Sequence, residues 1–192
     1  PDLSDTPEVF HLMAQVHQRT DNHAAAAVDW IILRAAYPDS SFSREAARQL
    51  QALATDDLKK QADTLKTMTA QIEKLKGDRD ERLAAMLGFL GGNTEKDFSS
   101  PIVNACASFL LSNRTWPQED VIEHALARQA VLLDPQVALY HFDKLLGLYP
   151  ASALRADSML AIGSVQRNAL FTFEDAAKTY TGLIEQFPDS AE

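Results

Sequence analysis

The hydrophobic positions of this chain recur with the period of an α helix, and the pattern stops three times in front of a proline. Counting back from each proline, leucine lies five residues earlier, an aromatic residue eight earlier and alanine twelve earlier. These spacings of three and four place the residues on one face of a helix. We predict that they pack the helices of three repeats: Ala26, Trp30, Leu33 and Pro38, then Ala138, Phe142, Leu145 and Pro150, and then Ala176, Tyr180, Leu183 and Pro188. Each proline should end its helix, because the residue before proline is pushed out of the α region.

A second helix is predicted before each of these. Thr6, Pro7 and Glu8 supply an N-cap, a proline at the first helical position and an acid in the first turn. The Trp-Pro-Gln-Glu-Asp segment at 116–120 starts another helix, and residues 152–168 form the third. Helix, short turn, helix and proline in succession predict an all-α solenoid of antiparallel hairpins. We expect alanine where the two helices of a hairpin come closest.

The middle of the chain does not follow the repeat. Residues 43–76 contain neither glycine nor proline, and Leu58, Leu65 and Ile72 recur every seven residues. This pattern predicts a long helix with a heptad seam, about 50 Å in length at ~1.5 Å per residue. A further helix is expected over 78–90, followed by a flexible linker at 91–93. These helices either pack as an irregular hairpin or project as an arm that grips a partner or a second copy. The predicted parts are residues 1–54, 55–97 and 98–192.

Composition narrows the classes of function. The net charge of -9 argues against nucleic acid, because a nucleic-acid binder needs a basic surface. The single cysteine, Cys106, excludes an intrachain disulfide. No apolar run reaches the ~18 residues of a membrane span, and residues 1–5 lack the basic and apolar parts of a signal peptide. Removal of a signal or a lipidated N-terminus remains an open alternative.

Candidate chemistry is sparse. Glu8 and His11 have the Glu-x-x-His spacing of a di-iron helix, but such a site needs a second copy of the motif and further glutamates. Asp120 and His124 lie one turn apart and could share a proton. Catalytic and phosphate-binding motifs are missing from the sequence. We therefore predict no catalytic, cofactor-binding or metal-binding residues, and a chain that is not an enzyme.

The second-helix pattern resembles the tetratricopeptide repeat, and residues 35–40 and 175–190 are similar to the longer repeats of bacterial cell-envelope proteins. Those include the BamD-type outer-membrane assembly lipoproteins and the Tol-Pal coordinator. The resemblance implies a non-catalytic scaffold in the periplasm or on the periplasmic face of the outer membrane. It also implies a groove lined by the first helix of each hairpin, in which a peptide or helix of another protein docks.

Three alternatives stay open at this point. The chain could be a cytoplasmic regulatory or chaperone-type repeat module, or the helical domain of an enzyme. The helices at 55–90 could also serve self-association. The sequence does not identify the residues that contact the partner.

Overall fold

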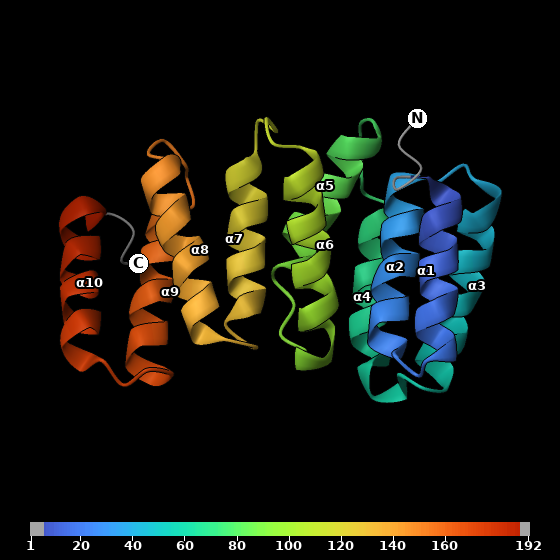
Figure 1. The fold of residues 1–192 in the computed structure, drawn as a ribbon, viewed down its shortest axis with the longest axis horizontal. Coiled ribbons are helices and arrows are strands. Elements are labelled where there is room, and N and C mark those ends of the chain that lie inside the picture. Colours follow the sequence, from blue (N-terminus) through green and yellow to red (C-terminus); the bar gives the residue numbers. More distant parts are fainter. Residues whose placement is uncertain (1–5, 189–192) are drawn as a thin grey trace. The chain divides into compact units, whose positions relative to one another are not determined.

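The computed structural model describes residues 6–188, which form ten α helices joined by short turns (Figure 1). The predicted all-α class is therefore confirmed, and successive helices pack as hairpins. The chain divides into two compact units, Pro1–Ile102 and Val103–Glu192, which we describe separately as unit 1 and unit 2. Their boundary lies a few residues after the predicted division between 97 and 98.

Unit 1 begins with a hairpin of α1 (Pro7–Arg19) and α2 (His23–Ala36). Thr6 occupies the N-cap position of α1, and Pro7 opens the helix. In the turn, Asp21 adopts a positive φ of 57°, and the side chain of Asn22 accepts a hydrogen bond from the Ala25 N–H at 3.3 Å. Most residues of α2 are buried, so α2 is the central helix of this unit.

The predicted long helix over 43–76 is wrong, because the chain reverses in the middle of it. α3 (Ser41–Thr55) stops at Asp56, and after the short 3₁₀ turn η2 (Lys59–Gln61) the chain returns as α4 (Ala62–Ile72). Leu58 is buried, and its N–H donates to the Leu53 carbonyl at 2.7 Å. Burial of this leucine inside the unit outweighs the helix propensity of the segment.

α4 and α5 (Arg79–Leu90) both pack against α2 within unit 1. A capping box of Asp78 and Glu81 starts α5. Arg82 fixes the helix in place, because its Nε donates to the Ala35 carbonyl of α2 at 2.7 Å and its Nη1 to the Leu75 carbonyl at 2.8 Å. Residues 55–90 are thus held along their length by buried side chains and hydrogen bonds.

After α5, the predicted linker at 91–93 is a hydrogen-bonded turn in which the Gly92 N–H donates to the Phe89 carbonyl at 3.0 Å. The 3₁₀ turn η3 (Lys96–Phe98) and α6 (Ser99–Ser112) follow, and α6 runs through the boundary of the two units.

Unit 2 continues with α7 (Glu119–Ala130), α8 (Pro135–Leu148), α9 (Arg155–Asn168) and α10 (Phe173–Gln186). α7 pairs with α8 and α9 with α10, and α8 also packs against α9 (Figure 1). No described helix of the chain has the length and apolar character to cross a membrane.

The second helices end where the aromatic–proline pairs predict. α2, α8 and α10 stop one residue before Tyr37, Tyr149 and Phe187. All three aromatic residues share one non-helical conformation, with ψ between 62° and 68°. Each donates its N–H to the leucine carbonyl four residues earlier, at 2.9 to 3.0 Å. The serine two residues after the last proline, Ser190, lies outside the described residues.

Candidate protein interface

The residues expected to pack the repeats fall into three groups by exposure. Seven are buried: Ala26, Trp30, Leu33, Ala138, Phe142, Leu145 and Ala176. Tyr180 and Leu183 are half-buried, and among the described helices α10 packs chiefly against α9. Pro38, Pro150 and Pro188 are exposed, so they end their helices without filling space between them.

Close approach within the third hairpin depends on a glycine in the first helix. A Cβ atom at Gly163 of α9 would lie 2.5 Å from Cε1 of Tyr180 in α10, well inside van der Waals contact. The hairpin is also tied by a hydrogen bond from Thr179 Oγ1 to Gln166 Oε1 at 2.8 Å. The aromatic position of this repeat therefore packs directly on the backbone of the facing helix.

The hairpin of α3 and α4 is open, unlike the three repeat hairpins. A cavity of about 440 Å³ separates the two helices. Its walls carry four alanines, and the buried side chains Leu50 and Leu65 also line it; the alanines are Ala47 and Ala54 of α3 and Ala62 and Ala70 of α4. Small side chains on both walls leave room for a bulky side chain from another molecule. We call this cavity the α3–α4 groove.

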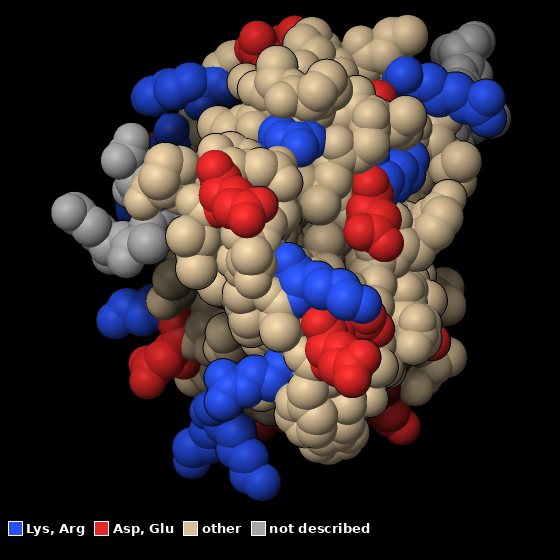
Figure 2. Space-filling view, turned by 90° about the vertical axis from the view of Figure 1, so that its left-hand side faces the viewer, with Lys and Arg blue, Asp and Glu red and all other residues tan. Residues whose placement is uncertain are grey.

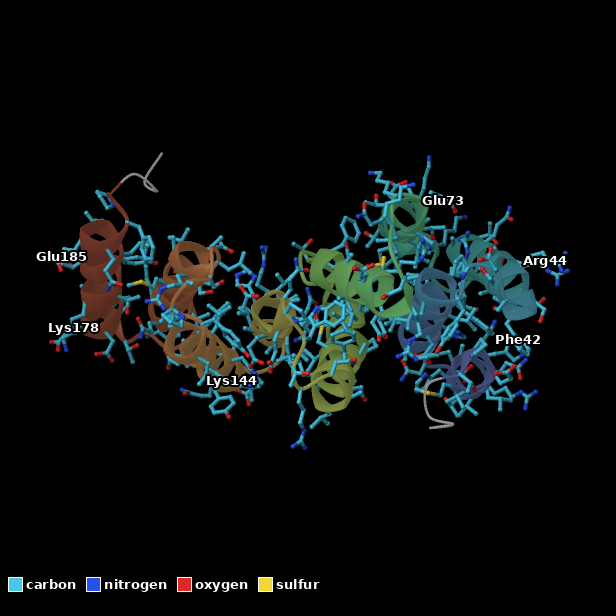
Figure 3. The ribbon with its side chains drawn as sticks, turned by 90° about the horizontal axis from the view of Figure 1, so that it is seen from above. Phe42, Arg44, Glu73, Lys144, Lys178 and Glu185 are labelled. Atoms are coloured by element: carbon cyan, nitrogen blue, oxygen red, sulfur yellow. The ribbon has the colours of Figure 1, made fainter. Side chains whose placement is uncertain are left out.

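The rim of the α3–α4 groove is charged. Arg34 of α2 lines the groove and forms an ion pair at 3.2 Å with Glu73, the residue that follows α4. Glu73 is exposed at the C-terminal end of α4 (Figure 3), and Lys66 of α4 also lines the groove. The groove is thus an apolar hollow with polar edges, which is the usual anatomy of a protein interface.

Two further cavities, of about 460 and 430 Å³, lie between α4 and α5. Both are lined by Phe89 and Thr67, and their walls are more polar than those of the α3–α4 groove. Cavities therefore lie on two sides of α4, one facing α3 and the others facing α5.

None of these three cavities is lined by α1, α7 or α9, the first helices of the three repeat hairpins. In unit 1, α1 and α3 contact each other directly. The rings of His11 and Phe42 lie 4.6 Å apart, and Gln18 Nε2 donates to Gln49 Oε1 at 3.1 Å. The repeat pattern does not predict the α3–α4 groove, although Ala47 and Ala54, seven residues apart on one helix face, are a sequence signal for it.

Unit 2 contains a buried ionic cluster between α7 and α8. Glu123 is fully buried, with its Oε1 bound to His141 Nδ1 and its Oε2 to Lys144 Nζ at 2.9 Å. Burial alone would raise the pKa of Glu123, but the hydrogen bonds and charges of His141 and Lys144 lower it. Both carboxylate oxygens are occupied, so the cluster acts as a bridge between helices and leaves no oxygen for acid–base chemistry.

Cys106 of α6 lies in unit 2 and is buried. Burial and the nearby charge of Glu123 raise the pKa of its thiol to about 12. The thiol therefore stays protonated at neutral pH and is not a nucleophile.

The other candidate residues from the sequence contact residues of their own helix or of other segments. His124 lies 2.9 Å from Asp157 of α9, whereas Asp120 accepts a hydrogen bond from Ser152 at 2.5 Å. His11 contacts the ring of Trp30 at 5.3 Å and hydrogen-bonds Gln15. Among residues 6–188, no three His, Cys, Asp or Glu side chains gather in a way that could hold a metal ion.

Comparison with known proteins assigns part of unit 2. Residues 157–190, which span α9 and α10, match the tetratricopeptide repeat family. No curated protein matches the chain significantly. Unit 2 thus contains a tetratricopeptide repeat, a fold that generally serves as a protein-interaction module. The match to this family agrees with the helical hairpins seen in both units of the described chain.

Proposed function

We propose that this protein is a non-catalytic scaffold that binds a helix of another protein in the α3–α4 groove. The observation that carries the proposal is the open hairpin, in which two alanine-lined helices leave a cavity of about 440 Å³ above buried leucines. On a protein surface, an apolar hollow with polar edges marks a binding site. The tetratricopeptide repeat at 157–190 supports the same class of function.

The chemistry of the groove defines the partner. Alanines on both walls select one or two bulky aliphatic or aromatic side chains, which would bury against Leu50 and Leu65. Glu73 and Lys66 at the rim can pair with charges of either sign and set the orientation of the bound segment. An amphipathic helix with apolar residues at every third and fourth position meets both conditions.

The setting we propose is an assembly of the bacterial cell envelope, on the periplasmic side. The support for it is the similarity of residues 35–40 and 175–190 to repeats of cell-envelope proteins. Affinity capture from separate periplasmic and cytoplasmic extracts tests this setting. Partners found only in the cytoplasmic extract would favour a cytoplasmic regulatory or chaperone-type module instead.

The binding surface is tested by filling it. Ala70 is exposed on α4 and lines the groove, so Ala70→Trp should fold normally and block the site. Ala70 also lines the cavity of about 430 Å³, so Ala54→Trp, at a residue that lines the α3–α4 groove and neither of the other two cavities, is measured beside it. Ala52, an exposed alanine of α3 that does not line the groove, provides the matched control Ala52→Trp. We would select binders from a displayed library of amphipathic helical peptides and measure their affinity by calorimetry.

We expect Ala70→Trp to weaken binding at least tenfold, which corresponds to about 1.4 kcal/mol. Ala52→Trp should bind like the parent. Equal binding by both variants would remove the α3–α4 groove from the proposal.

A further inference from the structure

The outer surface of α10 carries an exposed apolar stripe in unit 2. Phe173 is 63% exposed and Ile184 61%, and Ala177 and Thr181 lie between them on the same side of the helix. Figure 3 shows Lys178 and Glu185 pointing away from α9 beside this stripe. Viewed from the α10 end, the surface mixes charged groups of both signs with uncharged areas (Figure 2). We call these four residues the α10 stripe.

The earlier hairpins show what lies on the equivalent stripe. Counted back from the prolines, Ala177 corresponds to Ala27 of α2 and Leu139 of α8. Ile184 corresponds to Arg34 of α2 and Leu146 of α8. Ala27 is buried, and Arg34, Leu139 and Leu146 are half-buried. In unit 2, α8 packs against both α7 and α9, and α9 reaches the Leu146 carbonyl through Arg155. The face of α2 and of α8 that corresponds to the α10 stripe is therefore partly covered by other helices.

An arginine of a neighbouring helix reaches a carbonyl near the C-terminal end of both α8 and α2. Arg155 in the first turn of α9 donates from Nη1 to the Leu146 carbonyl at 2.5 Å. Arg82 of α5 donates to the Ala35 carbonyl in the last turn of α2. A cation at this place also interacts favourably with the C-terminal end of the helix dipole. Around the α10 stripe the charges are Glu174, Asp175 and Glu185 against Lys178, which favours a basic partner.

Phe171 adds an independent observation. It precedes α10 with a φ of +58°, a conformation that is unfavourable for a bulky side chain, and it is 69% exposed. Its ring lies 6.4 Å from that of Phe173 at the end of the stripe. Asp21, at the same distance before its proline, has the same conformation, which aspartate tolerates better. Phe171 thus keeps a strained backbone without burying its ring in the described structure.

We infer that the α10 stripe, extended by Phe171, docks an amphipathic helix of a partner protein with an arginine in its first turn. The bound helix packs on α10 as α9 packs on α8, with its arginine at the carbonyl of Ile184 or Glu185. This surface is in unit 2 and is separate from the α3–α4 groove of unit 1.

The probe is a peptide of residues 152–169, which contains α9 and its arginine. Residues 160 and 167, both exposed in α9, are joined by a hydrocarbon staple so that the peptide is helical. Fluorescence anisotropy of the labelled peptide with the full chain should show saturable binding. Ile184→Glu should weaken binding at least tenfold, and the Arg155→Gln peptide should bind several-fold more weakly.

Leu148→Glu is the matched control, because Leu148 of α8 is 62% exposed and lies outside the stripe. It should leave binding unchanged, as should Ala70→Trp in the α3–α4 groove. Ile184→Glu and Ala70→Trp therefore distinguish a failure of the α10 stripe as a binding site from a failure of the α3–α4 groove. Absence of saturable binding, or equal loss with Leu148→Glu and Ile184→Glu, would overturn the inference.

Phe171→Asn separates docking from a structural role. It should raise the urea midpoint of unfolding, because asparagine tolerates a positive φ, and at the same time weaken peptide binding several-fold. A variant that binds the peptide as tightly as the parent would remove Phe171 from the site.

Discussion

Ala176 and Ala177 are neighbours in sequence with opposite surroundings. Ala176 is 3% exposed on the side of α10 that packs against α9, while Ala177 faces outward. A helix turns by about 100° per residue, so one step moves a side chain from the interior to the surface.

We expect Ala176→Trp to lower the free energy of unfolding by about 1 to 3 kcal/mol or more, because the large ring forces α9 and α10 apart. Ala177→Trp should stay within about 0.5 kcal/mol of the parent. Urea unfolding of the three proteins measures the difference. If Ala177→Trp is equally damaging, Ala176 is not the residue of α10 that faces α9 in solution.

Asp29 of α2 is buried and accepts a hydrogen bond from His17 of α1 at 2.7 Å. Burial raises the pKa of Asp29 from 3.8 to about 6, although the hydrogen bond and charge of His17 oppose the rise. Between these two pKa values the folded protein binds the proton more strongly than the unfolded chain. The stability that protonation of Asp29 contributes is therefore complete below about pH 4 and is lost as the pH rises through about 6.

The stability of the parent relative to Asp29→Asn should accordingly fall by roughly 2 to 3 kcal/mol between pH 4 and pH 7. Urea unfolding of both proteins across this range tests the prediction. Asp39→Asn, at an exposed aspartate, controls for the change in net charge. A gap between parent and Asp29→Asn that does not vary with pH would contradict it.

At the scale of the element, two helical glycines have different surroundings. A Cβ at Gly163 of α9 would meet the Tyr180 ring at 2.5 Å, whereas a Cβ at Gly147 of α8 would meet nothing within 4 Å. Alanine is the better helix former at both positions, so only the contact with α10 distinguishes them.

Gly147→Ala should stabilise the protein by about 0.5 to 1 kcal/mol. Gly163→Ala should destabilise it by about 1 to 2 kcal/mol, because Tyr180 has to move. Thermal unfolding measures both changes. The double variant Gly163→Ala with Tyr180→Leu should recover part of the loss; if Gly163→Ala stabilises the protein instead, the close packing of α9 on α10 is not present in solution.

At the scale of the whole molecule, α4 and α5 belong to the core of unit 1. They cover α2, and Leu65, Met68, Ile72 and Leu87 are buried between these helices. Removing residues 55–92 and joining the flanks by a short linker would expose the central helix of the unit. We expect cooperative unfolding of unit 1 to be lost.

The two tryptophans report the units separately, since Trp30 lies in unit 1 and Trp116 in unit 2. Two variants are needed, each with one tryptophan kept and the other replaced by phenylalanine. In the variant that keeps Trp30, the deletion of residues 55–92 should abolish the unfolding transition. The transition seen by Trp116 should remain. A sharp Trp30 transition in the deleted protein would instead show that these helices are an accessory arm.

The sequence by itself determined the helical class, the three hairpins and the ends of their second helices. These features depend on local physics: period, capping residues and the restriction that proline places on the residue before it. Tyr37, Tyr149 and Phe187 share one backbone conformation for this local reason.

Only the tertiary structure decided the path of the middle segment and the position of the candidate surfaces. Residues 43–76 favour a helix locally, yet burial of Leu58 reverses the chain and opens the α3–α4 groove. The sequence also suggested a shared proton for Asp120 and His124, but in the structure Asp120 contacts Ser152 and His124 contacts Asp157, both from other segments. Local pattern fixes which residues share a helix face, whereas long-range burial decides what each face meets.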